Sequence, residues 1–229
     1  MRAVNLVPVP ACPLCGSRKG KRACPAKRAA ICSVCCGEKR IVEIACPSGC
    51  VWLGQGIQND AKREALDYLQ HQDPRKGARW IRAVERFGLV LETIERAIAF
   101  SVVRDLRDDE LLIALEAARK TFESETKGVV FESLPETPTL QALTRELVAS
   151  VRSLVRILDQ ERAKLAGREE SLPSIGPEVL AESFAVMGER CAYHVNRGAE
   201  SGSLVEHLRR IHPRPGGPEE SGPSRIVLA

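Results

Sequence analysis

Aromatic residues are scarce in this 229-residue sequence, at 4% of the total, so an aliphatic core of Leu, Ile, Val and Ala is expected. A run of about 18 apolar residues, as a membrane-spanning helix requires, is missing. The first ten residues, MRAVNLVPVP, are too short and too rich in proline for a secretory signal. These absences favour a cytoplasmic protein without membrane contact.

The sequence also lacks the motifs of common enzyme classes. It contains no phosphate-binding glycine loop, no nucleophile elbow and no His and Asp pair placed for acid–base chemistry. The acidic run DLRDDE, residues 105–110, is better explained as the start of a helix than as a metal cage. The sequence therefore favours a non-enzymatic protein without excluding an enzyme.

Cysteine is plentiful, with nine residues, of which eight lie between Cys12 and Cys50. A reducing compartment disfavours structural disulfides, and eight thiols are the ligand count of two tetrahedral zinc sites. A secreted disulfide scaffold is the competing interpretation, but the missing signal and the long cysteine-free segment after Cys50 argue against it. We therefore predict two structural zinc ions, with the ligands Cys12, Cys15, Cys24, Cys32, Cys35, Cys36, Cys46 and Cys50.

The spacing of the cysteines suggests how they divide between two ions. Two CxxC pairs, at 12–15 and 32–35, can each offer both sulfurs to one metal from a tight turn. If the first four cysteines in sequence order bound one ion, Cys32 and Cys35 would be ligands of different ions. Adjacent residues of an extended backbone project to opposite sides, so Cys35 and Cys36 suit two different ions. We favour an interleaved assignment, with Cys12, Cys15, Cys32 and Cys35 on one ion and Cys24, Cys36, Cys46 and Cys50 on the other.

Residues 12–50 resemble a known class of zinc module. They contain CPLCG at 12–16, Cys24 followed by proline, the cluster CSVCCG at 32–37 and the pair CPSGC at 46–50. This order resembles the HIT-type zinc finger and its cross-braced, treble-clef relatives, although a histidine ligand is missing and two cysteines are adjacent. The resemblance implies a structural zinc module and raises a redox-sensing or ubiquitin-ligase-like role as a further alternative.

The rest of the chain has helical spacing. Apolar residues recur every three or four positions over 80–102 and 140–158, as on one buried helix face. Thr137 followed by Pro138 is a helix start signal. Further helices are expected over 59–70, 105–128, 177–196 and 204–211. We predict a mainly α protein, with a zinc module over 1–56, an α-helical bundle over 57–212 and a disordered tail over 213–229.

The predicted zinc module is basic, with nine Lys or Arg residues against two acids and a formal charge of +7 over residues 1–56. Such a charge is compatible with binding to nucleic-acid phosphates. Because two zinc–tetrathiolate sites would add four negative charges, some cations should neutralise the sites instead, Lys39 and Arg40 among them. Trp52 is the single aromatic residue, so stacking on bases is not supported, and we expect it to pack the module against the first helix. The candidate nucleic-acid-binding residues are Arg18, Lys19, Lys21, Arg22, Lys27, Arg28, Lys39 and Arg40.

A third metal site is suggested by the spacing of Cys191, His194, His207 and His212, which is that of a classical zinc finger with His194 in place of the second cysteine. The aromatic residues usual in such a finger are missing. We therefore favour a terminal amphipathic helix with surface histidines and keep a third zinc as the alternative.

Taken together, these features predict a non-enzymatic adaptor or assembly factor that contacts a protein partner through a zinc module and a helical bundle. The alternative is a DNA- or RNA-binding regulator that uses the cations of the module. The sequence identifies neither the partner nor the oligomeric state.

Overall fold

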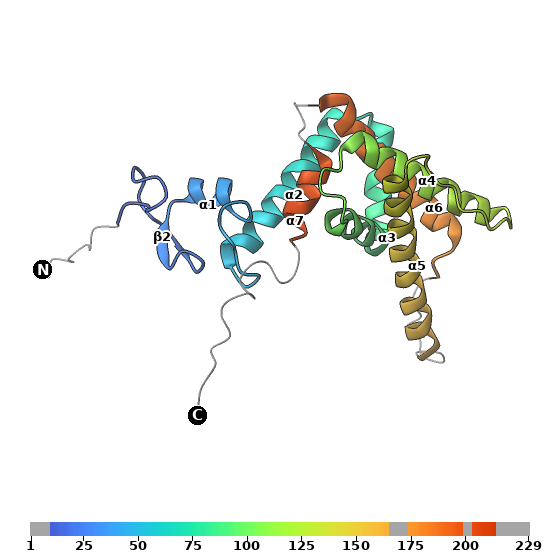
Figure 1. Cartoon of the computed structure of the whole chain (residues 1–229), viewed down its shortest axis with the longest axis horizontal. Helices are drawn as coiled ribbons and strands as arrows, with labels where there is room; N and C mark the ends of the chain where they lie inside the picture. The colour runs from blue at the N-terminus through green and yellow to red at the C-terminus, as the bar shows by residue number, and fades with distance from the viewer. Residues whose placement is uncertain (1–9, 165–173, 199–202, 214–229) are drawn as a thin grey trace, which may run out of the picture. The chain divides into compact units, whose positions relative to one another are not determined.

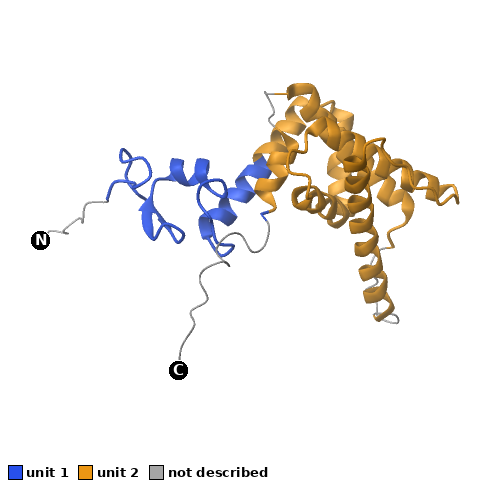
Figure 2. Ribbon diagram, viewed as in Figure 1, with its two compact units in different colours: residues 1–62, 213–229 blue, residues 63–212 orange. Residues whose placement is uncertain are grey.

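The structure is a computed structural model that describes residues 10–164, 174–198 and 203–213. These residues form seven helices and one two-stranded sheet, which confirms the prediction of a mainly α protein (Figure 1). The chain divides into two compact units, residues 1–62 with 213–229 and residues 63–212 (Figure 2). Apart from its first residue, the predicted tail over 213–229 lies outside the described residues. The predicted domain limits stay predictions.

The first unit begins with the cysteine-rich segment. Strands β1 (Arg22–Cys24) and β2 (Ala29–Ile31) form an antiparallel hairpin, and helix α1 (Ser33–Lys39) follows almost directly. The N-cap of α1 is Cys32, whose Sγ accepts a hydrogen bond from the backbone N–H of Cys35 at 3.3 Å. We did not predict α1, because seven residues are too few for an apolar stripe to repeat.

Helix α2 (Val51–His71) starts earlier than the predicted helix over 59–70, because the glycines of its first turns weaken the helical signal. One of them, Gly56, leaves room for the end of the Arg40 side chain: a Cβ here would lie 2.5 Å from Nη1 of Arg40. The Arg40 guanidinium therefore rests on α2, where it donates to the carbonyl of Gly56 at 3.3 Å and pairs with Asp60. This buried ion pair joins the end of α1 to α2.

The second unit is a helical bundle. It contains α3 (Pro74–Phe100), α4 (Asp108–Thr126), α5 (Pro138–Lys164), α6 (Pro177–Arg197) and α7 (Leu204–Ile211). Helices α3 and α4 each pack against α5, α6 and α7. Helix α5 begins at Pro138, as the start signal predicted. None of the helices in the described ranges is both long and apolar enough to traverse a bilayer.

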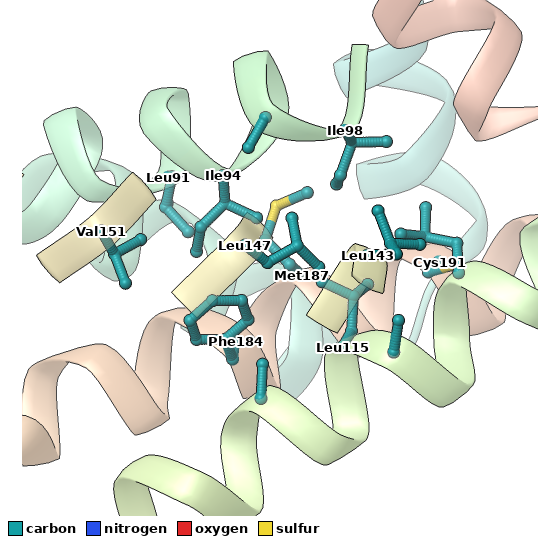
Figure 3. Close-up of a cluster of buried hydrophobic side chains, with 14 of the residues drawn as sticks. Leu91, Ile94, Ile98, Leu115, Leu143, Leu147, Val151, Phe184, Met187 and Cys191 are labelled. Carbon is teal, nitrogen blue, oxygen red and sulfur yellow. The ribbon is translucent and has the colours of Figure 1, made fainter. Parts of the chain in front are cut away.

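The bundle core is aliphatic, as the scarcity of aromatic residues predicted. Figure 3 shows side chains of α3 and α5 meeting in its centre, among them Ile94 and Leu147, which are both fully buried. Met187 and Phe184 of α6 complete the same cluster. The predicted stripe over 140–158 is buried as far as Val151, so it provides the face through which α5 joins the bundle.

A buried charge cluster links α6 to α2 and α3 within the second unit. Arg190 is only 3% exposed, and its guanidinium lies 2.8 Å from Glu64 Oε1 and 2.5 Å from Glu95 Oε1. It also lies over the ring of Trp80, 4.8 Å from the centroid. Burial alone would raise the pKa of Glu64, but the charge and hydrogen bonds of Arg190, together with a hydrogen bond to His194, outweigh burial and lower that pKa to about 2. The carboxylates are therefore ionised at neutral pH and depend on Arg190 for compensation.

We expect Arg190→Met to lower the free energy of unfolding by about 3 kcal/mol or more, because it leaves two buried carboxylates without their cation. Arg79 is the matched control, since it also joins α3 to two carboxylates of α6, Glu182 and Glu189, but its side chain is 34% exposed. Arg79→Met should cost about 1 kcal/mol or less. Urea denaturation at pH 7 measures both values, and equal losses would contradict the assigned role of Arg190.

Candidate metal centre

Cys12 and Cys15 lie in a tight turn at the start of the described chain. The backbone N–H of Gly16 donates to the carbonyl of Cys12 at 2.8 Å, and the N–H of Cys12 donates to the carbonyl of Arg18 at 2.7 Å. Gly16 has a φ of 67°, in the left-handed region that glycine adopts at little cost. The turn therefore presents both sulfurs of the first CxxC pair on one side.

Cys32 and Cys35 come from the first turn of α1, directly after the hairpin. The chain that follows the first pair runs against β2, where the N–H of Lys21 donates to the carbonyl of Ile31 at 2.9 Å. This approach requires Gly20, because a Cβ there would lie 2.2 Å from the carbonyl oxygen of Ala30. The hairpin thus brings the second CxxC pair to the first.

The four sulfurs of Cys12, Cys15, Cys32 and Cys35 all lie within 4.8 Å of one another. In the part of the chain that the structure describes, no other group of three or more Cys, His, Asp or Glu ligand atoms is so close. The Sγ atoms of Cys15 and Cys32 are 3.9 Å apart, and a zinc–tetrathiolate with bonds of about 2.3 Å has S···S distances of about 3.8 Å. The gathered residues are those of the first interleaved set, and they fit a zinc ion.

The four thiols differ in acidity in a way that favours a bound cation. Hydrogen bonds from Ser17 lower the pKa of Cys15 to about 5. Burial, together with the neighbouring thiols, raises the pKa of Cys35 to about 12. The Cys15 thiol therefore loses its proton readily, whereas the Cys35 thiol keeps its proton because a second negative charge beside the first is unfavourable. A divalent soft metal removes this conflict, because it binds all four as thiolates.

Arg18 is the cation that hydrogen-bonds to these thiolates. Hydrogen bonding to Cys32 and the charges of Cys15 and Cys32 raise the pKa of the Arg18 guanidinium. The Lys39 ammonium bonds to Glu43 at 2.5 Å, and both Glu43 and the charge of Cys35 raise its pKa, whereas Arg40 pairs with Asp60. We had placed Arg18 among the nucleic-acid-binding candidates. Its position three residues after a ligand cysteine was the available signal for this role.

The sulfurs of the second predicted set, Cys24, Cys36, Cys46 and Cys50, do not all lie within 4.8 Å of one another. Cys24 and Cys36 are buried in the same cluster as the first set, and Cys46 packs against that cluster. Burial raises the pKa of Cys46, and the charges of Cys50, Cys24 and Cys36 raise it further. Cys35 and Cys36 lie in a helix, so their side chains diverge by about 100° and not by the opposite projection of an extended strand that we had assumed.

The residues of the suggested third site have other partners. The Sγ of Cys191 donates to the carbonyl of Asp108 at 3.1 Å. The Nε2 atoms of His194 and His212 lie 3.1 Å from Glu64 and 3.0 Å from Glu95, respectively. Burial lowers the pKa of His207 to about 4, so its ring is neutral near pH 7. These histidines surround the Arg190 cluster and are largely buried, in contrast to the predicted surface positions.

The remaining basic candidates differ in exposure. Arg40 is 9% exposed and already paired, so it is not part of an open basic surface. Arg22 lies over the ring of Trp52, 4.9 Å from the centroid, and Trp52 packs against the cysteine cluster. The exposed cations without an ion pair within the described residues surround the hairpin, and they are Lys19, Lys21, Lys27 and Arg28.

No protein-family model, curated protein or solved structure matches the chain significantly. The resemblance to the HIT-type zinc finger therefore rests on the cysteine pattern and on the four gathered sulfurs.

Arg18→Gln should weaken zinc binding by about tenfold, because it removes a cation that stabilises two of the thiolates. Lys19→Gln is the matched control, since it removes the same charge from the next residue, which is exposed and has no ion pair within the described residues. Competition with a chromophoric chelator at pH 7 measures both affinities. Equal affinities of the two variants would show that Arg18 has no specific role at the thiolates.

Proposed function

We propose that the protein is a non-enzymatic zinc-binding adaptor or assembly factor, in which zinc folds the N-terminal module and the helical unit contacts a protein partner. The observation that carries the proposal is the set of four gathered cysteines, Cys12, Cys15, Cys32 and Cys35. Catalytic zinc keeps a position open for water, usually beside His or Glu ligands. Four thiolates fill a tetrahedral ion completely, so the site suits a structural role.

A second zinc ion, bound by Cys24, Cys36, Cys46 and Cys50, completes the module in this proposal. The shared burial of Cys24 and Cys36 and the charges that they exert on Cys46 support it. A two-zinc module of this kind would be similar to the cross-braced HIT-type finger. All nine cysteines are free thiols, which fits a reducing compartment such as the cytoplasm.

Contact with a protein partner is supported by an exposed apolar segment between α4 and α5. Val129, Val130 and Phe131 are consecutive and are 56%, 87% and 61% exposed. The segment is held in place from α4, because the N–H of Val129 donates to the carbonyl of Ser124 at 3.0 Å and the Ser124 hydroxyl donates to the carbonyl of Phe131 at 3.1 Å. Adjacent exposed apolar side chains on a fixed backbone are typical of a protein-binding surface.

The metal part of the proposal predicts two zinc ions per chain by elemental analysis of the purified protein. Cys35→Ser and Cys36→Ser should each retain about one, and the double variant should retain almost none, because the two residues serve different ions. Cys191→Ser is the control and should retain two. A double variant that still holds one zinc would place both residues on the same ion, and a folded module without zinc would refute the metal claim.

The exposed cations around the hairpin, Lys19, Lys21, Lys27 and Arg28, favour nucleic-acid binding as the second candidate. One pair of assays separates the two functions. If four phosphates are contacted, the affinity of the intact protein for a labelled RNA or DNA should fall between 50 and 200 mM salt with a log–log slope of about −3.6.

The adaptor function predicts no such binding. It predicts instead a stoichiometric protein partner that co-purifies from the source cells at 200 mM salt and is lost when Val130 and Phe131 are both replaced by Asp. Val102→Asp is the control, because Val102 is 78% exposed elsewhere on the same unit. Steep salt-dependent nucleic-acid binding without a co-purifying partner would reverse the order of the two candidates.

A further inference from the structure

A groove on the second unit lies between α4, α5 and the start of α6. Its volume is about 720 Å³, within the range of about 300–1,000 Å³ that is typical of small-molecule sites. Its lining is mostly apolar and includes Phe122 of α4, Val148 and Val155 of α5, Ile175, and Leu180 of α6. An apolar lining of this size requires a ligand with a hydrocarbon or aromatic body.

The rim of the groove carries three arginines of α5 and two carboxylates. Arg145 lies 3.5 Å from Glu132, and Arg152 is paired with Glu125. The Arg152 guanidinium also lies over the ring of Phe122, 5.6 Å from the centroid. Among the described residues, these contacts neutralise both carboxylates of the rim, so neither attracts a cationic ligand strongly.

Arg156 is the rim cation that differs from the other two. It is exposed, it lines the groove, and no carboxylate of the described residues pairs with it. It lies one helical turn beyond Arg152, at one end of the groove. The groove follows α5 for about 16 Å from Arg145 to Arg156, since a helix rises 1.5 Å per residue. The surface thus combines a long apolar lining with one positive charge at its end.

We infer that this groove binds an amphipathic carboxylate, such as a free fatty acid of medium chain length. The hydrocarbon chain lies along the apolar lining, and the carboxylate accepts hydrogen bonds from the Arg156 guanidinium, whose planar fork matches the two carboxylate oxygens. The inference goes beyond the proposed adaptor function and does not depend on zinc.

The test uses intact, ¹⁵N-labelled protein titrated with monomeric dodecanoate and, separately, with dodecylamine, which has the same chain and the opposite charge. Dodecanoate should bind saturably at one site, perturb the amide signals of Ala149 and Ile175, and bind about tenfold more tightly than dodecylamine. Arg156→Gln should weaken dodecanoate binding by about tenfold. Ala149→Phe, at an exposed position in the lining, should fill the groove and abolish binding.

Arg162→Gln is the matched control, because Arg162 lies on the same helix but pairs with Asp159 and does not line the groove. It should leave the affinity unchanged. Equal affinities for dodecanoate and dodecylamine, or equal losses in the Arg156 and Arg162 variants, would overturn the inference. It would also be overturned if dodecanoate left the groove signals unperturbed. Arg156 is exposed, so its variant remains folded and the result is interpretable.

Discussion

Four sulfurs held within 4.8 Å of one another are the constraint on which the first unit depends. Thiolates at this distance repel one another, and their repulsion is overcome only by a cation among them. Among the described residues, the buried cluster of this unit consists mainly of cysteines with Ile31 and Ile44, and the Arg40–Asp60 ion pair joins α1 to α2. A module with so small an apolar core needs a metal or a comparable crosslink to fold. A metal ion at the four cysteines is therefore expected to stabilise this unit.

The second unit is stabilised by different means. Its helices bury a continuous aliphatic core, and the Arg190 cluster adds a specific set of polar contacts within it. Such a cluster contributes little net stability but strongly disfavours arrangements in which a carboxylate loses its partner. This unit also carries the exposed segment over 129–131 and the groove along α5. The candidate metal site thus lies in one unit, and the candidate protein-binding segment and the groove lie in the other.

The features that the sequence predicted are local or periodic. Apolar spacing located α3 and α5, and the two CxxC pairs identified the sulfurs that gather, because both signals lie within a few residues. The grouping of the two CxxC pairs at one site also followed from keeping each pair intact, while the second interleaved set stays a prediction. Of the two cations assigned to neutralise the sites, Arg40 is paired with Asp60, whereas Lys39 is shared between Glu43 and the charge of Cys35. A cation between competing anions cannot be assigned from spacing alone.

Long-range contacts were beyond prediction for the same reason. Arg190 meets Glu64 across 126 residues and Glu95 across 95 residues, and no periodic signal connects them. The surface positions predicted for the three histidines were wrong, because tertiary packing placed them near Glu64 and Glu95. Burial of a polar residue depends on which helices surround it, and a single sequence does not contain that information.

The central claim, that cysteines alone hold the metal, is tested most directly by X-ray absorption at the zinc edge of the intact protein. The account predicts a first shell of about four sulfurs per zinc at about 2.3 Å and no lighter ligand. A shell that contains nitrogen or oxygen at about 2.0–2.1 Å would contradict it.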